Sequence, residues 1–284
     1  MGVHARFGFR SLGSVTIGNA NVQRDAVIPQ GLLPTDFNDD FRPDILFQNL
    51  TTRETSVRLL DGSTQIGSAV GLTIPVGWTL AGVADLSRNS SADYILFNPA
   101  TRQTEVRYAV RGVQSGVAAG PTLPMGQTLA AIEDFDRDGN RDFLSVNAAT
   151  GATTVQFLNN LIGVIRTAAG PTIPAGFIVT GTADFNRDGF ADFVLFNPTT
   201  NASQIQYLNG TPAVIGTIAG PAIPAGWTLA GPLLINPDSK PDLLLFNKSL
   251  GATSFWVMDG VTFQSSTRGP IAPAGWTLAA PRAQ

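Results

Sequence analysis

The sequence predicts an all-β fold built from five repeated units of four antiparallel strands each. One aspartate recurs at nearly constant spacing, since Asp44, Asp93, Asp142, Asp192 and Asp242 lie 49, 49, 50 and 50 residues apart. Each unit holds four short apolar or alternating runs separated by turns rich in Gly, Pro and Asn. No segment shows a helical period long enough to compete. Four antiparallel strands per repeat of this length are typical of a β-propeller blade.

The chain begins with an element that we assign as an N-terminal arm of residues 1–30. Val3, Ala5, Phe7 and Phe9 alternate with polar positions, and a second apolar run follows at 15–17. This pattern predicts a β-hairpin. The propeller follows at 31–284, with repeats near 31–76, 77–125, 126–175, 176–225 and 226–274 and a closing strand at 275–284.

The first two strands of each repeat enclose an Asp-rich loop. A Gly-Trp-Thr-Leu strand at 77–80 recurs at 226–229 and 275–278. The second strand, as at 94–97, is apolar throughout, which indicates burial on both faces. An asparagine that can bond to nearby backbone and start a turn follows this strand in every repeat. These residues are Asn49, Asn98, Asn147, Asn197 and Asn247.

The last two strands of each repeat form a predicted hairpin. The third strand alternates, as at 204–208, and the fourth leads into a Gly-Pro-x-Ile-Pro linker, as at 170–174. Asn-Gly and Asp-Gly pairs suit the type I′ turn that matches the twist of a hairpin. Two-residue turns are therefore expected at 61–62, 111–112, 159–160, 209–210 and 259–260.

The number of blades depends on the partner of the C-terminal strand at 275–280. The first repeat has only a short first strand at 32–34, which ends in Pro34, and proline cannot donate to a strand ladder. The C-terminal strand would fill that gap and close a ring of five blades. Alternatively, it would join the N-terminal hairpin in an incomplete sixth blade.

The loops between first and second strands predict Ca²⁺ sites in three repeats. A hard cation takes six to eight oxygens, and a tight loop supplies them from alternating side chains and a backbone carbonyl. Gly139 and Gly189, at loop position 6, allow the turn that this requires. The predicted ligands are Asp134, Asp136, Asp138, Asn140 and Asp142 in the third repeat, Asp184, Asn186, Asp188, Phe190 and Asp192 in the fourth, and Asp36, Asn38, Asp40, Arg42 and Asp44 in the first.

Repeats two and five depart from this pattern. Repeat two has Ser87 and Asn89 at positions 3 and 5, and repeat five has Leu234 at position 1. We interpret these two loops as turns whose side chains cap backbone amides. The Ca²⁺ ions are expected to be structural, because nothing near the loops resembles a nucleophile or a base.

The D-x-[DN]-x-D-G-x-x-D loops inside four-stranded repeats resemble the FG-GAP/VCBS family, which includes integrin α-chain propellers and propeller lectins. The resemblance covers about 250 residues and is most specific in repeats three and four. Repeat one departs from it at Phe41, where glycine is expected. The resemblance implies a propeller fold, Ca²⁺ in the loop between first and second strands, and extracellular binding or adhesion.

Composition narrows the classes of function. A net charge of −3 gives no basic footprint for nucleic acid. The sequence has no run of about eighteen apolar residues, so no membrane span is expected. The chain has no cysteine, a single histidine (His4) and no arrangement typical of a hydrolase, so we expect that it is not an enzyme. The N-terminus does not resemble a secretory signal, although the expected location is extracellular or at the cell surface.

Two functions are therefore expected. The first is recognition of carbohydrate or cell-surface glycan, bound between blades, with Trp256 as a candidate exposed aromatic. Trp78, Trp227 and Trp276 recur in register and are interpreted as packing residues instead. The alternative is a structural subunit of an extracellular assembly, in which the arm with Phe7 and Phe9 adds as a strand to a neighbouring copy.

Overall fold

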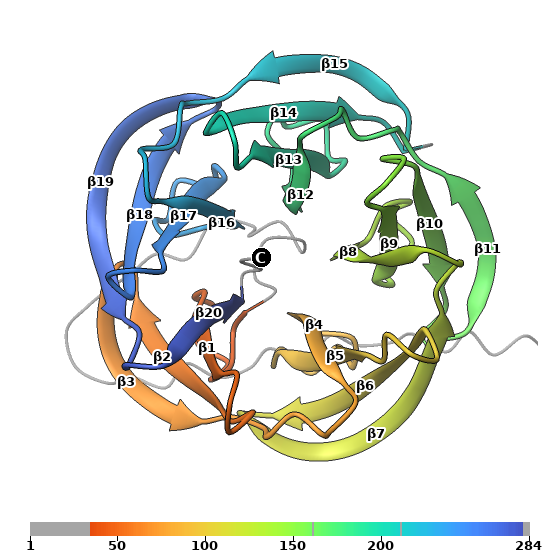
Figure 1. Ribbon diagram of the computed structural model, residues 1–284, viewed down its shortest axis with the longest axis horizontal. Helices are drawn as coiled ribbons and strands as arrows, with labels where there is room; N and C mark the ends of the chain where they lie inside the picture. Colours follow the sequence, from red (N-terminus) through yellow and green to blue (C-terminus); the bar gives the residue numbers. More distant parts are fainter. Residues whose placement is uncertain (1–34, 161, 211, 281–284) are drawn as a thin grey trace, which may run out of the picture.

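A computed structural model shows a five-bladed β-propeller (Figure 1). It describes residues 35–160, 162–210 and 212–280, and these form twenty strands in five four-stranded antiparallel sheets. The predicted fold class is thus confirmed. The strand order of each blade runs from the axis outwards. Blade 1 is β20 (Trp276–Ala280), β1 (Ile45–Asn49), β2 (Thr55–Asp61) and β3 (Thr64–Val70); blade 2 is β4 (Thr79–Ala84), β5 (Asp93–Phe97), β6 (Gln103–Val110) and β7 (Val113–Thr122); blade 3 is β8 (Gln127–Glu133), β9 (Asp142–Asn147), β10 (Thr153–Leu158) and β11 (Val164–Ala169); blade 4 is β12 (Ile178–Ala183), β13 (Asp192–Asn197), β14 (Ala202–Leu208) and β15 (Val214–Ala219); and blade 5 is β16 (Thr228–Leu233), β17 (Asp242–Asn247), β18 (Ala252–Asp259) and β19 (Thr262–Ile271).

The ring closes through a sheet that combines both ends of the propeller. β20 pairs antiparallel with β1, with Phe47 opposite Leu278 and Gln48 opposite Thr277. Blade 1 therefore contains strands from opposite ends of the sequence (Figure 1). The five-bladed prediction is confirmed, and the alternative of a sixth blade is wrong, because the C-terminal strand is used to complete blade 1. The N-terminal arm, including Phe7 and Phe9, lies outside the described residues.

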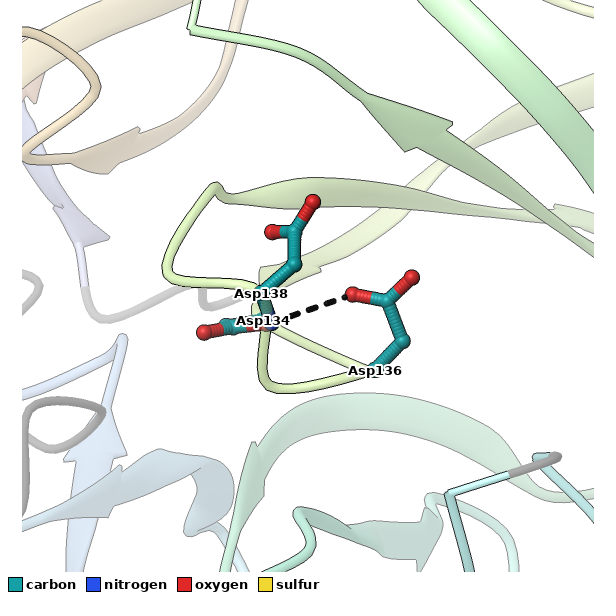
Figure 2. Close-up of side chains that lie close together, drawn as sticks. All are labelled: Asp134, Asp136 and Asp138. Carbon is teal, nitrogen blue, oxygen red and sulfur yellow. Dashed lines mark hydrogen bonds between the residues drawn. The ribbon is translucent and has the colours of Figure 1, made fainter.

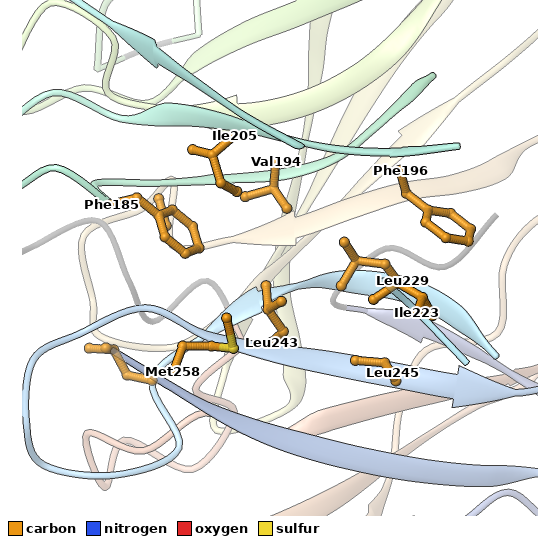
Figure 3. Close-up of a cluster of buried hydrophobic side chains, with 11 residues drawn as sticks. Phe185, Val194, Phe196, Ile205, Ile223, Leu229, Leu243, Leu245 and Met258 are labelled. Atoms are coloured by element: carbon orange, nitrogen blue, oxygen red, sulfur yellow. The ribbon is translucent and has the colours of Figure 1, made fainter. Parts of the chain in front are cut away.

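The hydrophobic core lies between blades rather than at one centre. The described residues form five buried clusters, and each joins the facing sheets of two neighbouring blades. The second strand of a blade is buried on both faces because its alternate side chains reach different neighbours. On β17, Leu243 and Leu245 pack towards blade 4 (Figure 3), whereas Leu244 packs towards blade 1. This arrangement explains the uninterrupted apolar runs of the sequence.

The predicted asparagine turns are present in all five blades. The side-chain oxygen of Asn49, for example, accepts hydrogen bonds from the backbone N–H groups of Thr51 and Thr52. The same oxygen of Asn147 and of Asn197 accepts the N–H groups two and three residues further on. Each asparagine thus ends its second strand by offering the backbone a local partner.

The hairpin prediction holds only in part. Two-residue turns occur in blades 1, 2 and 5, where pairing ends at Asp61 with Thr64, Val110 with Val113, and Asp259 with Thr262. In blades 1 and 5 the central residues lie one position later than expected. Longer loops replace the two-residue turns in blades 3 and 4, where Leu158 pairs with Val164 and Leu208 with Val214.

The longer loops have a local physical cause. The Asn159 side chain accepts the Gly163 N–H at 2.9 Å, and Ile162 is buried in the core between blades 2 and 3. Asn209 accepts the Ala213 N–H in the same way. Side-chain capping by asparagine thus stabilises a wider turn than the type I′ turn predicted for these pairs.

Among the described residues there is no helix that is both long enough and apolar enough to cross a membrane.

Candidate functional site

The five Asp-rich loops connect the first and second strands of each blade. The loop at 134–142 joins β8 to β9, and the loop at 184–192 joins β12 to β13. At position 6, Gly139 and Gly189 have φ of 85° and 90°, which confirms the predicted turn. Phe41, at the same position of the first loop, also has a positive φ of 63°. The first loop therefore keeps the turn without glycine, at a cost in backbone strain.

The recurring aspartate at loop position 9 is fully buried in every blade, as Asp44, Asp93, Asp142, Asp192 and Asp242. One oxygen of Asp142 accepts the N–H of Phe135 in its own loop, and the other accepts the N–H of Leu158 on the third strand, both at 2.9 Å. This pair of bonds recurs in all five blades at 2.8–3.1 Å. A buried carboxylate with two N–H donors is a structural connector, whether or not a cation is also present.

Burial raises the pKa of these carboxyl groups. Desolvation is the main cause, and the pKa reaches about 7 for Asp44, Asp142 and Asp192. For Asp242 it reaches about 6, and for Asp93 it is raised. The two backbone N–H bonds oppose the rise, because they favour the charged form.

The aspartate at loop position 1 caps the amides of its own loop. Asp134 accepts the N–H groups of Asp138 at 3.1 Å and Gly139 at 2.9 Å. Asp184 does the same for Asp188 and Gly189. Asp36 and Asp85 cap their loops in the same manner. Leu234 of the fifth loop offers no such acceptor.

The third loop gathers three carboxylates that fit a hard cation. Asp134, Asp136 and Asp138 each place an oxygen so that all three atoms lie within 4.8 Å of one another (Figure 2). Close carboxylates repel each other, and a divalent cation removes that repulsion. The donor set is all oxygen, as Ca²⁺ prefers. Asp142 lies deeper, bonded to backbone, and the predicted position 7, Asn140, donates from its backbone N–H to Asp138 at 2.7 Å.

The first and fourth loops have asparagine at position 3. The side-chain amide of Asn186 donates to Asp188 at 2.9 Å, and that of Asn38 donates to Asp40 at the same distance. The amide oxygen of asparagine can also serve as a ligand for Ca²⁺. Position 7 is occupied by Phe190 in the fourth loop and by Arg42 in the first, where Arg42 forms an ion pair with Asp61.

An arginine beside the third loop was not predicted from the sequence. Arg166 on β11 donates to Asp136 at 2.9 Å, and its guanidinium lies 3.3 Å from the ring centroid of Phe157. The equivalent residue in blade 4 is Gly216, which lies opposite Tyr207 as Arg166 lies opposite Phe157. A guanidinium at Asp136 would compete with a metal ion for that carboxylate, and the fourth loop has no counterpart of Arg166 at Asn186.

A second candidate site is a polar cleft between blades 2 and 3. Its volume is about 410 Å³, within the range of small-molecule sites. The second loop, strands β6 and β7, and the loop after β10 form its walls. Its lining comprises Leu86, Ser87, Arg88, Tyr108, Ser115, Gly116 and Asn160. No motif in the sequence marks these residues, because they come from four separate elements.

The tryptophans lie away from this cleft. Trp78, Trp227 and Trp276 are partly buried and pack against clusters between blades, in agreement with their interpretation as packing residues. Trp256 is also partly buried, and its ring meets Phe263 edge to face with the centroids 4.7 Å apart. Its role as a ligand platform stays a prediction.

Comparison with known proteins assigns neither a family nor an activity. No family model and no curated protein matches the chain. The chain is similar to the solved structure of a nidogen–laminin complex, with a TM-score of 0.47 and 10% identity over 84% of this chain and 99% of that chain. A Bacteroides caccae protein of unknown function has a TM-score of 0.44 and 11% identity, over 79% and 73% of the two chains. Myxococcus xanthus glutaminyl cyclase has a TM-score of 0.40 and 9% identity, over 75% and 88%.

The raised pKa of the buried aspartates predicts how stability depends on pH in metal-free protein. The unfolded-state pKa is near 3.8 and the folded value for Asp142 is about 7, so between these values the folded state binds more protons. The free energy of unfolding should therefore be fully retained below pH 3.8 as far as these groups are concerned, and should fall as pH rises towards 7.

Denaturant titrations of metal-free protein at pH 5 and pH 7.5 measure this effect. We expect a higher unfolding midpoint at pH 5. The Asp142→Asn variant removes one titrating group, so its midpoint should differ less between the two pH values. A wild-type midpoint that rises between pH 5 and pH 7.5 would contradict the assignment.

Proposed function

We propose that this protein is a Ca²⁺-stabilised recognition module of the FG-GAP/VCBS type that binds carbohydrate outside the cell or at its surface. The polar cleft between blades 2 and 3 is the observation that carries this proposal. The role proposed is binding rather than catalysis. Two of the three glutamates, Glu105 and Glu133, are held in ion pairs with Arg107 and Arg141 at 2.8 and 2.5 Å.

The cleft has the composition expected of a sugar site. Tyr108, partly buried beside Gly116 on the neighbouring strand, offers an aromatic surface at the cleft. Ser87, Ser115 and Asn160 offer hydroxyl and amide groups that can both donate and accept hydrogen bonds. A sugar ring presents apolar C–H groups on its faces and hydroxyls around its edge, so these two kinds of lining are complementary to it.

The three clustered carboxylates of the third loop, and the equivalent residues of the fourth loop, support the Ca²⁺ part of the proposal. Residues Asp134, Asp136 and Asp138, together with Asp184, Asn186 and Asp188, would hold the ions. Bound Ca²⁺ would neutralise the clustered charge and fix the loops. Extracellular Ca²⁺ modules bind with dissociation constants on the order of 10⁻⁴–10⁻³ M. At 10 mM Ca²⁺, each such site would stabilise the fold by about 1.4–2.7 kcal/mol.

The fourth loop gives the clearest test of Ca²⁺ binding, since none of its proposed ligands is paired with an arginine as Asp136 is with Arg166, although Arg137 lies over the neighbouring Phe190 ring. Asp188→Ala should lower the melting temperature in 10 mM Ca²⁺ much more than in chelator, because it removes a ligand. Asp238→Ala is the matched control. Asp238 caps Lys240 as Asp188 caps Phe190, but its loop has Leu234 at position 1.

Differential scanning calorimetry with and without Ca²⁺ distinguishes a side chain that binds Ca²⁺ from one that only caps backbone N–H groups. The control should lose similar stability in both conditions. If Asp188→Ala is destabilised equally with Ca²⁺ and with chelator, the fourth loop is an ordinary turn.

Carbohydrate binding is tested on a glycan array in the presence of Ca²⁺. We expect wild-type signal on a subset of glycans and loss of that signal in Tyr108→Ala, which removes the aromatic surface of the cleft. Tyr207→Ala is the control, because Tyr207 lies at the same position of blade 4, opposite Gly216, and does not line the cleft. Absence of signal on every glycan would contradict the lectin function.

A second candidate function is assembly, and the outer edge of blade 4 favours it. Val214, Ile215 and Ile218 are 41%, 58% and 38% exposed on β15, whose six residues include neither a charge nor a proline. Among the described residues nothing pairs with the outer edge of β15. Such an edge is a template for an added strand. The alternating arm at 3–9 of a second copy is the occupant that we propose.

Size-exclusion chromatography with light scattering tests the assembly. Deletion of residues 1–27 should leave a folded monomer. Thr217→Lys, which places a charge on β15, should also prevent oligomers, whereas Thr167→Lys at the same register of β11 should not. Oligomers of the truncated protein would show that the arm is not the connector, and a monomeric wild type would contradict assembly.

A further inference from the structure

We propose that the sugar bound in the cleft between blades 2 and 3 is acidic, and that Arg88 recognises its carboxylate or sulfate group. This inference rests on the carbohydrate-binding function proposed above. Arg88 is the only charged residue among the described residues that line the cleft. The rest of the lining is neutral, so the cleft presents one positive charge beside hydroxyl, amide and aromatic groups. A small pocket that shares Arg88 with the cleft is also lined by Asp85, which caps backbone N–H groups, and by Arg141, which pairs with Glu133.

The Arg88 side chain is fixed in place and keeps free donors. One terminal nitrogen, Nη2, donates to the side-chain oxygen of Asn140 at 2.6 Å and to the backbone carbonyl of Gly139. A guanidinium has five N–H groups, so those on Nε and Nη1 remain for a ligand. Within the described parts of the chain, no carboxylate forms an ion pair with Arg88. A pre-positioned guanidinium without a counter-ion is suited to bidentate binding of an anion.

The second loop has lost the negative charges that its relatives carry. Where the third loop has Asp136 and Asp138, the second has Ser87 and Asn89. The carboxylates that it retains are directed at backbone. Asp85 accepts the N–H groups of Asn89 and Ser90, and the buried Asp93 accepts those of Leu86 and Ala109. The loop that departs most from the metal pattern at these positions is thus the loop that lines the cleft.

Loop position 4 is also arginine in blades 3 and 4, as Arg137 and Arg187, but the surroundings of these two side chains differ from those of Arg88. Arg137 lies over the ring of Phe190 with its guanidinium carbon 5.0 Å from the centroid. The pKa of Asp259 is lowered mainly by Lys240, which forms an ion pair with it at 2.6 Å, and to a lesser extent by Arg187. Nearby positive charge is also compensated at Arg141, which is paired with the buried Glu133 at 2.5 Å. Arg88 therefore differs in facing the cleft, whereas Arg137 covers an aromatic ring and Arg187 lies near Asp259.

The test uses a glycan array that contains matched pairs of sugars in the presence of Ca²⁺. Each pair has an acidic member, such as a uronic acid, a sialylated glycan or a sulfated glycan, and its neutral counterpart of the same stereochemistry. We expect wild type to bind only acidic members, and the uronate, sialyl and sulfate pairs to show which anion is used. Arg88→Gln should bind them about 10- to 100-fold more weakly, the loss expected when a charged hydrogen bond is removed.

Arg187→Gln, at the same loop position of blade 4, is the matched control and should bind as wild type does. Arg88→Lys keeps the charge and should retain part of the affinity, while circular dichroism checks that each variant is folded. Equal binding of neutral and acidic members, abolished by Tyr108→Ala, would overturn this inference and leave carbohydrate binding intact. Absence of signal on all glycans would overturn both.

Discussion

In all five blades, a buried aspartate carboxylate at loop position 9 joins the loop to the third strand. Its two oxygens accept one backbone N–H from each side, and both bonds are made inside the core where water cannot replace them. Loss of either acceptor would leave a buried donor unpaired. This interaction ties the second and third strands of a blade to the loop that follows the first strand, and it sets where that loop leaves the sheet. The nearly constant spacing of the aspartate is the sequence trace of this requirement.

Because the ninth position holds each loop, the other positions are able to differ between blades. The third and fourth loops have side-chain carboxylate and amide oxygens at positions 1, 3 and 5. In the third loop, Arg166 from β11 donates a hydrogen bond to the carboxylate at position 3, Asp136. The fifth loop lacks the acid at position 1, and the second has neutral residues at positions 3 and 5. The second loop also lines the cleft between blades 2 and 3. Under the function proposed above, the third and fourth loops would bind cations and the second loop would contribute to ligand binding.

The periodic features of this chain were predictable, whereas the features that depend on a single blade were not. The strand order and the closing strand follow from a pattern that recurs along the chain. The turn at Gly139 follows from a glycine at position 6 of an Asp-rich loop. The wider turns at Asn159 and Asn209 were missed because a side-chain cap outweighed the local turn preference. Arg166 and Tyr108 were missed for another reason. Arg166 bonds to Asp136 and Tyr108 lines a cleft with Asn160, and in both cases the two residues are distant in sequence and only the fold brings them together.

Amide hydrogen exchange measures whether the position-9 carboxylate holds each blade together. In native protein, the N–H groups of Phe135 and Leu158, with their counterparts in the other blades, should exchange only through global unfolding. The N–H of Asn140, bonded to an exposed side chain of the same loop, should exchange much faster. If the Phe135 and Leu158 amides exchange as fast as that of Asn140, the carboxylate of Asp142 does not connect the loop to the third strand.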